Sequence, residues 1–245
     1  MKILVCISNV PDTTTKITFT PDNKNFNTAG VQFVINPYDE YALTRAIELK
    51  EAQGGTVTVI NVGEADSDAN IRKALAIGAD EAIRVNAKPA DALFVARQIA
   101  HYAKEGAYDL ILMGKESVDY NGFQVHGMVA ELLGLPAIVP AIKLDVEGNT
   151  ATLEREIEGG KEIVKVNLPL VASCQQPMAE PRIPNMRGIM TARTKPLKVV
   201  EPVSAQPGTV YESYSLPEKK SGVKLVDAAN AGELIRLLRN EAKVI

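Results

Sequence analysis

Short, unbroken apolar runs alternate with amphipathic segments through the first half of the chain. Such runs are typical of strands in a parallel sheet, because helices cover both faces of that sheet. The amphipathic segments carry apolar residues three or four positions apart, as helices on a sheet do. We therefore expect an α/β fold with a doubly wound, mostly parallel sheet. The expected strands are residues 2–8, 56–62, 81–85 and 110–113, and the expected helices begin near residues 36, 67, 89 and 123.

Residues 108–136 form the stretch around which we expect the chain to be organised. Its apolar run ends at Gly114, a helical pattern begins near Phe123, and a polar loop joins the two. A loop between a strand end and a helix start presents unpaired N–H groups and the positive end of the helix dipole, which suit a phosphate. An ordinary strand-to-helix turn explains the same pattern. The loop is no Walker P-loop, because Glu116 stands where a magnesium-binding hydroxyl would be, and no G-x-G-x-x-G follows an expected strand.

Beyond Pro136 the pattern changes to alternation between apolar and polar positions. We expect an antiparallel extension, with strands at residues 141–146, 151–157 and 162–168, because Glu-Gly-Asn and Glu-Gly-Gly turn signals separate them. Residues 170–174 are apolar without alternation and are expected to return to the main sheet. In the long connection after the first strand we expect a small hairpin of residues 17–19 with residues 31–33.

From Gln175 onward the chain is rich in proline, and only residues 228–242 have helical spacing. A segment too apolar to be free and too proline-rich to form its own core is expected to wrap a partner. The predicted domains are therefore residues 1–174, an α/β nucleotide-binding domain with the antiparallel extension from about residue 141, and residues 175–245, a recognition segment and partner-wrapping arm.

Composition and charge argue against several classes of protein function. A net charge of −3 argues against a nucleic-acid partner, and no apolar run has the length of a membrane span. We expect a cytoplasmic protein, since no signal-peptide pattern precedes the first strand. Cys6 and Cys174 are expected to be buried free thiols. His101 and His126 have no spaced partners that indicate a metal site or a catalytic triad.

Five blocks in order carry a family resemblance: residues 36–40 (NPYDE), 74–80 (ALAIGAD), 114–124 (GKESVDYNGFQ), 154–160 (EREIEGG), and Glu180-Pro181-Arg182 followed by Ile189-Met190. Over nearly its whole length the chain resembles the beta subunits of the electron transfer flavoprotein family. The resemblance implies an adenine-nucleotide-hydrolase-like fold and a heterodimer whose alpha subunit carries the redox FAD. It also implies an electron-carrier subunit without catalytic residues of its own.

The same resemblance implies two sets of site residues. AMP would be a structural ligand of Cys6, Asn36, Pro37, Tyr38, Asp39, Val62, Gly114, Lys115, Asp119, Asn121, Gly122, Phe123, Gln124 and Val125. Partners of the acyl-CoA dehydrogenase type, from fatty acid oxidation, would dock on Arg182, Met186, Arg187, Ile189 and Met190, with Met186 as the apolar anchor.

The chain departs from the family pattern in both regions. Among the changes in the loop, His126 replaces the small glycine nearest the phosphate, and Arg187 and Gly188 stand where a proline and an asparagine are familiar. A bifurcating branch of the family binds a second FAD in this subunit, but its Gly-Ala-Asp-Thr block is absent after residue 85, so we favour AMP. A stand-alone adenine-nucleotide-binding module is the remaining alternative, although it would not need the proline-rich tail.

Overall fold

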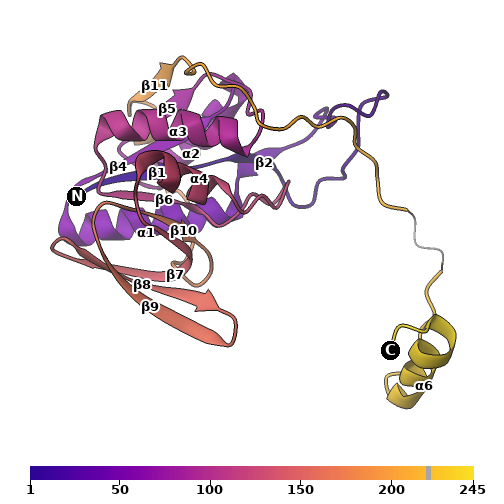
Figure 1. The fold of residues 1–245 in the computed structure, drawn as a ribbon. Helices are drawn as coiled ribbons and strands as arrows, with labels where there is room; N and C mark the ends of the chain where they lie inside the picture. Colours follow the sequence, from indigo (N-terminus) through magenta and orange to yellow (C-terminus); the bar gives the residue numbers. More distant parts are fainter. Residues whose placement is uncertain (219–221) are drawn as a thin grey trace. The chain divides into compact units, whose positions relative to one another are not determined.

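The computed structural model describes residues 1–218 and 222–245 (Figure 1). Within these residues one mixed sheet has nine strands in the order β11-β5-β4-β1-β6-β10-β7-β8-β9. A separate antiparallel pair joins β2 (Asn9–Pro11) to β3 (Phe33–Ile35). The strands of the main sheet are β1 Lys2–Cys6, β4 Thr56–Val62, β5 Glu81–Val85, β6 Leu110–Gly114, β7 Ala137–Glu147, β8 Thr150–Ile157, β9 Gly160–Asn167, β10 Leu170–Cys174 and β11 Leu197–Val200.

All neighbouring strands from β11 to β7 are parallel, whereas β7, β8 and β9 pair antiparallel. The chain moves outward from β1 to β4 and β5, and then crosses to β6 on the other side of β1. Ligands of doubly wound sheets bind beyond the strand ends at such a reversal. The expected fold class is confirmed, including the extension, whose antiparallel pairing begins at Ala141.

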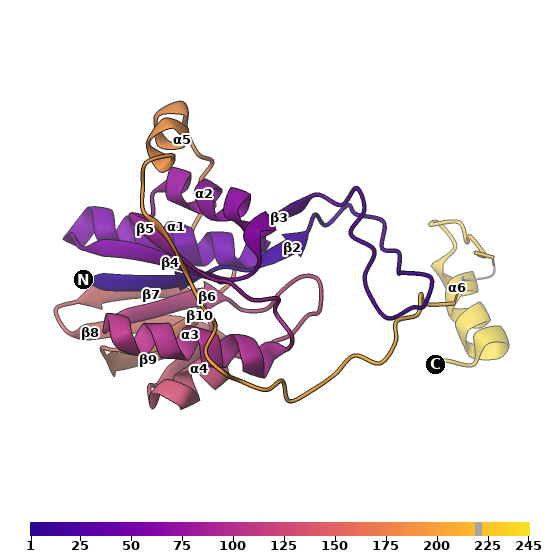
Figure 2. The same cartoon turned by 90° about the horizontal axis from the view of Figure 1, so that it is seen from above.

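Helices cover both faces of the parallel part, as the unbroken apolar strands require. On one face α1 and α2 contribute residues such as Leu43 and Ile71 to a core with Ile3 and Val5. On the other face α3 and α4 pack over Leu4 and Ile60, and Figure 2 shows the two helical layers. The helices are α1 Pro37–Gln53, η1 Ala65–Ser67, α2 Asp68–Ile77, α3 Ala92–Gly106, α4 Val125–Leu133, α5 Met186–Ala192, α6 Ala231–Leu237 and η2 Leu238–Ala242.

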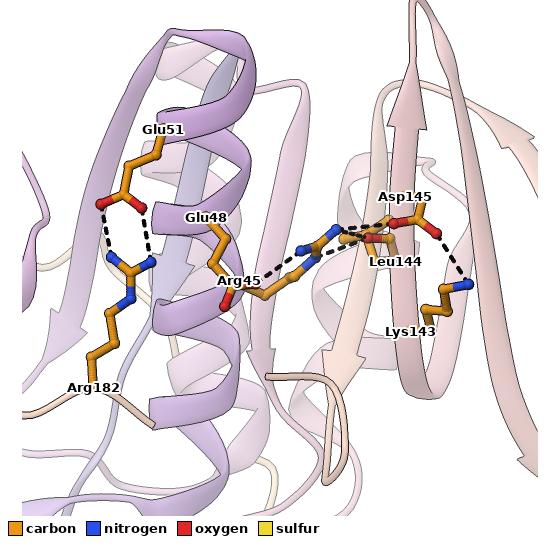
Figure 3. A network of polar contacts seen from close by, with 7 residues as sticks. All are labelled: Arg45, Glu48, Glu51, Lys143, Leu144, Asp145 and Arg182. Carbon is orange, nitrogen blue, oxygen red and sulfur yellow. Dashed lines mark hydrogen bonds and ion pairs between the residues drawn. The ribbon is translucent and has the colours of Figure 1, made fainter. Parts of the chain in front are cut away.

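Arg45 of α1 ties the antiparallel extension to the main fold (Figure 3). Its Nε donates to the Leu144 carbonyl of β7 at 2.9 Å, and its Nη2 lies 3.1 Å from the Asp145 carboxylate. The half-buried guanidinium also pairs with Glu48 one turn along α1. These bonds fix the point where β7 leaves its parallel neighbour β10 and continues into the extension.

The expected hairpin of residues 17–19 with 31–33 is wrong. Asn9–Pro11 pairs with Phe33–Ile35 instead, and Phe19 bridges Phe26 within the intervening loop. The β2–β3 pairing buries Val10 and Ile35, whereas Ile17 is 42% exposed, so burial of apolar side chains selects the observed register.

The segment after Gln175 contains two elements that we did not expect. Helix α5 packs against α2, and β11 adds a parallel edge strand beside β5. Residues that follow β11 are held by α3: the buried Gln98 side chain donates to the Val203 carbonyl and accepts from its N–H, at 2.9 and 2.7 Å. This part of the predicted wrapping arm therefore packs on its own chain.

Contacts divide the chain into one unit of residues 1–17 and 28–212 and a second unit of residues 18–27 and 213–245. Within the second unit Phe19 stacks on Tyr214, and the Tyr214 N–H donates to the Asn23 carbonyl at 2.8 Å. The functional division that we expect at residue 174 stays a prediction, and residues 219–221 of the expected arm lie outside the described residues. Across the described ranges no helix has both the length and the apolarity of a membrane span.

Candidate functional site

The carboxyl ends of β4, β1 and β6 meet at one edge of the sheet, because these strands are parallel neighbours. Cys6, Val62 and Gly114 are the last residues of the three strands. Helix α1 and the loop of residues 115–124 begin at this same edge. The structure thus brings together the strand ends and the two segments to which the sequence assigned nucleotide contacts.

Asp39, in the first turn of α1, joins the segment that follows β1 to the last residue of β6. Its carboxylate accepts hydrogen bonds from the Ser8 N–H at 2.7 Å, the Ser8 hydroxyl at 2.8 Å and the Gly114 N–H at 2.8 Å. Burial raises the pKa of Asp39 to about 6, although these hydrogen bonds oppose the rise. Gly114 must be a glycine, since a Cβ there would lie 2.4 Å from Asp39 Oδ1 and 2.6 Å from Tyr38 Cβ.

Asn36 ties the polar loop to the same edge. Its buried side-chain amide donates to the Glu116 carbonyl at 2.9 Å and accepts from the Val118 N–H at 3.2 Å. Its own N–H donates to the Ser8 carbonyl at 3.0 Å. Pro37 then occupies the first helical turn, where a missing N–H costs nothing. The Asn-Pro pair is thus both a helix start and an anchor for the loop.

The far end of the loop opens α4, which begins at Val125. Among the residues that the structure describes, no side chain caps this helix, unlike α3, whose N-cap Asp91 accepts from the Phe94 N–H. The first-turn N–H groups of α4 are therefore left for another acceptor, and the helix dipole favours a negatively charged one. Lys115 adds positive charge at the start of the loop, with its Nζ 5.0 Å from the Tyr38 ring centre and 3.5 Å from Glu116.

The other expected contact residues lie along this loop. Asp119, Asn121, Phe123 and Gln124 are exposed, and Gly122 is partly exposed. Asn121 adopts a left-handed backbone with φ of 50° and bonds back to the Ser117 carbonyl, which turns the chain toward α4. Asp119 accepts from the Tyr120 N–H at 2.9 Å. These residues form the outer wall of the site, while Asn36 and Asp39 form its buried base.

Sequence reasoning missed two buried polar residues at this edge. Asn61 of β4 is buried, and its amide donates to the Ile7 carbonyl at 2.9 Å while its Oδ1 has no hydrogen-bond partner in the described ranges. Arg84 of β5 is also buried, with its Nε 2.7 Å from Asp68 at the start of α2 and its Nη1 bonded to the Gly63 carbonyl. A polar residue inside an otherwise apolar strand was the available signal in both cases.

The two cysteines are free and buried, as expected. Burial raises the pKa of the Cys6 thiol far above its ordinary value and that of Cys174 to about 12. Both therefore remain protonated and act as small apolar groups of the core rather than as nucleophiles. Among residues 1–218 and 222–245, no group of three or more His, Cys, Asp or Glu side chains could hold a metal ion.

The expected docking residues lie away from this edge, on and before α5. Arg182 forms two hydrogen bonds to the Glu51 carboxylate of α1, at 2.7 and 2.8 Å (Figure 3). The exposed apolar side chains of this segment are Ile183 (90%), Met186 (74%), Ile189 (42%) and Met190 (68%). Arg187 is also exposed. The segment is therefore anchored by one arginine and presents a cluster of apolar side chains to solvent.

The geometry of the first site fits an adenine nucleotide. An uncapped helix start suits a phosphate. The switch-point edge is where this fold class binds its ligands. Asn61 Oδ1 is a buried acceptor without a partner in the described ranges, and it lies beside the Val62 strand end.

Comparisons with known proteins give one family-model match and several similar chains. The electron transfer flavoprotein domain matches residues 24–205. The electron transfer flavoprotein subunit beta of Bacillus subtilis (strain 168) is 38% identical over 259 aligned positions, which cover 100% of both chains. That of Syntrophomonas wolfei is 36% identical, covering 100% of this chain and 98% of that protein. That of Homo sapiens is 36% identical, covering 92% of each.

Proposed function

This chain belongs to the electron transfer flavoprotein family as a beta subunit, and we propose that it binds AMP as a structural ligand at the carboxyl edge of β4, β1 and β6. As such a subunit it is part of an electron carrier, its partner is an alpha subunit, and flavin belongs to the complex. We further propose that the redox FAD is held by the alpha subunit, and that this chain supplies no catalytic residue. A cytoplasmic location stays a prediction.

The observation that carries the AMP proposal is the Asn36–Asp39 segment, which holds the loop of residues 115–124, the end of β6 and the segment after β1 in one place. The N–H groups that open α4 would hold the phosphate, whose charge complements the helix dipole. The backbone around Tyr38 and the Val62 strand end would contact the adenosine part. When bound, AMP supplies an anion and a planar base that stabilise the loop, and the residues of this chain bind and orient it.

We also propose that the segment of Arg182, Met186, Arg187, Ile189 and Met190 docks a redox partner of the acyl-CoA dehydrogenase type. Its support is the exposure of three neighbouring apolar side chains, Ile183, Met186 and Met190, on an anchored segment. Exposed apolar clusters of this kind mark protein interaction sites. The nearby arginines would steer a partner with an acidic rim and would act mainly on the association rate.

The AMP proposal is tested by denaturing the purified heterodimer and quantifying the released nucleotides. We expect one AMP and one FAD per heterodimer. An Asn36→Ala variant should release less AMP but the same FAD, because it frees the loop without touching the alpha subunit. Two FAD and no AMP would instead identify a bifurcating-type subunit, and a chain that purifies with neither alpha subunit nor flavin would favour a stand-alone nucleotide-binding module.

A further inference from the structure

Helices α2 and α5 lie side by side (Figure 2), and a hollow of about 540 Å³ lies between them. The volume exceeds that of any single side chain, so a segment of another molecule can enter it. We call this recess the α2–α5 hollow. Its apolar lining includes Ala69, Ala76, Ile189 and Ala192. Its charged lining consists of Arg72, Lys73 and Arg193.

Arg72 gives the hollow a cation that is held in place. Its Nη1 donates to the carbonyls of Ala192 and Lys195 at 2.8 and 2.7 Å. Its Nε and Nη2 make no hydrogen bond, and the guanidinium no ion pair, with any group in the part of the chain that the structure describes. An arginine binds a carboxylate best through two parallel N–H groups. The Nε and Nη2 groups of Arg72 are therefore available as a preformed carboxylate site.

The other two cations leave the hollow with an excess of positive charge. Arg193 is exposed and makes no ion pair within residues 1–218 and 222–245. The Nζ of Lys73 lies 2.8 Å from the Glu40 carboxylate, so one carboxylate offsets one of the three cations. An apolar lining with unbalanced positive charge is complementary to an acidic side chain whose neighbours are apolar.

The hollow is continuous with the segment that we assign to partner docking. Ile189 belongs to both, because it lines the hollow and is exposed one helical turn after Met186. Met186 projects into solvent, whereas the hollow is a recess beside it. A protein that receives the Met186 side chain would bring its own surface against this recess. A side chain that fills the recess would also exclude water from the contact around the anchor.

We propose that the α2–α5 hollow receives an acidic side chain of the redox partner, an inference that rests on the docking function proposed above. The carboxylate accepts hydrogen bonds from Nε and Nη2 of Arg72, and Arg193 adds a second positive charge. The apolar residues on either side of the carboxylate pack on Ala69 and Ile189. The partner is thus a protein with a pocket for Met186 and, next to that pocket, an aspartate or glutamate between apolar residues.

The experiment measures electron transfer from an acyl-CoA dehydrogenase to the heterodimer as the dehydrogenase concentration is varied. Ala69→Phe fills the hollow from an exposed position of α2, and it should raise the half-saturating concentration about fivefold or more. Arg193→Gln should raise it several-fold and make it less sensitive to added salt, because one charge of the contact is lost. Lys104→Gln is the matched control. It removes one exposed positive charge from α3, on the other face of the sheet, and should leave half-saturation unchanged.

The outcomes separate this inference from the docking function on which it rests. Wild-type half-saturation in Ala69→Phe would overturn the hollow as an acceptor if Met186→Ala still raises half-saturation. Equal effects of Arg193→Gln and Lys104→Gln would show general electrostatic steering and would also overturn it. Wild-type values in Met186→Ala as well as Ala69→Phe would overturn the proposed docking function itself.

Cross-linking of the wild-type heterodimer covers the case in which Ala69→Phe displaces α5. A carbodiimide joins a carboxylate directly to a lysine amine, and Lys73 lines the hollow. With the dehydrogenase present, mass spectrometry should find Lys73 joined to an acidic residue of the dehydrogenase as well as to its neighbour Glu40. Cross-links between the two proteins that never include Lys73 would contradict the proposal. Cross-links from Lys73 to the alpha subunit or to a second copy of this chain would assign the hollow to that chain instead.

Discussion

Gly188 of α5 lies so close to Ala76 of α2 that a Cβ at position 188 would be 2.2 Å from the Ala76 carbonyl oxygen. The side chains of two further residues, Arg72 and Lys195, hold the same segment on α2. Arg72 donates to the carbonyls of Ala192 and Lys195 at 2.8 and 2.7 Å, and Lys195 donates to that of Leu75 at 2.8 Å. The departure from the family pattern at residue 188 is therefore explained by close packing of two helices.

We predict that Gly188→Ala displaces α5 from α2, because the neighbouring atom is backbone and cannot rotate away. Overpacking of this kind costs about 1–3 kcal/mol. Thermal unfolding should show the loss, and trypsin should cleave faster after Arg187 and Arg193. Gly232→Ala in α6 is the control, since a Cβ there meets nothing within 4 Å. Unchanged cleavage in Gly188→Ala would contradict a tight α5–α2 contact.

A second prediction concerns the pH dependence of stability. The pKa of Asp39 is about 6 in the folded chain against an ordinary value of 3.8, because its carboxyl is buried. Between these values the folded state keeps a proton that the unfolded state has lost. The stability due to this group is therefore fully present below about pH 4 and is lost as pH rises to about 6, by at most about 3 kcal/mol.

Asp39→Asn provides the comparison that isolates this effect. The amide cannot ionise, and its NH₂ group would face one of the N–H donors of Ser8 or Gly114, so the variant should be less stable by about 1–3 kcal/mol at low pH. Urea unfolding from pH 4 to pH 7 should show that the difference in free energy of unfolding between wild type and variant becomes smaller as pH rises. A gap that stays constant across this range would show that Asp39 does not titrate there.

Gly114→Ala is predicted to damage the nucleotide edge directly. The added methyl group would overlap the Asp39 carboxylate and the backbone N of Asp39, at 2.4 and 2.8 Å. We expect a loss of about 2 kcal/mol or more in stability and a smaller AMP content in the purified heterodimer. Gly160→Ala in β9 meets no atom within 4 Å and should retain full AMP content.

The strand ends of the site could be predicted from sequence because burial on both faces leaves unbroken apolar runs. The runs that end at Val62 and Gly114 show this directly, whereas β1 ends at Cys6, two residues before the expected end at residue 8. Because ligands of such sheets bind at the carboxyl ends of the strands, the position of the site could then be predicted without any side-chain contact. The family resemblance supplied Asn36 and Asp39, whose contacts with Ser8 and Glu116 join segments far apart in the chain.

Other parts of the fold depend on tertiary contacts that local patterns do not contain. The seven residues of α5 include Gly188, so their helical signal is weak, and their position depends on α2. The sequence of the four residues of β11 does not by itself predict a strand, because the strand forms through pairing with β5. The partner of Asn61 is Ile7, just after β1, and that of Arg84 is Asp68 of α2, so only the unusual placement of both residues in apolar strands was visible in the sequence.

The last prediction concerns Met186, which is 74% exposed and therefore contributes little to the packing of its own chain. Arg182 anchors the residues that precede Met186 through its paired hydrogen bonds to Glu51. Asn185 caps α5 by accepting from the Gly188 N–H at 2.8 Å. A segment already held in place loses less conformational entropy when it docks. Methionine also adapts to irregular apolar pockets, which suits an anchor for several partners.

We expect Met186→Ala to leave the melting temperature of the heterodimer unchanged and to raise the dehydrogenase concentration that gives half-maximal electron transfer by about fivefold or more, since truncating a buried interface anchor commonly costs at least about 1 kcal/mol. Met178→Ala is the matched control. Met178 is 6% exposed within the core, so its truncation should cost about 2–5 kcal/mol of stability without changing half-saturation below the melting temperature. Half-saturation equal to wild type in Met186→Ala would exclude the anchor role, because the structure gives this side chain no other large contact to lose.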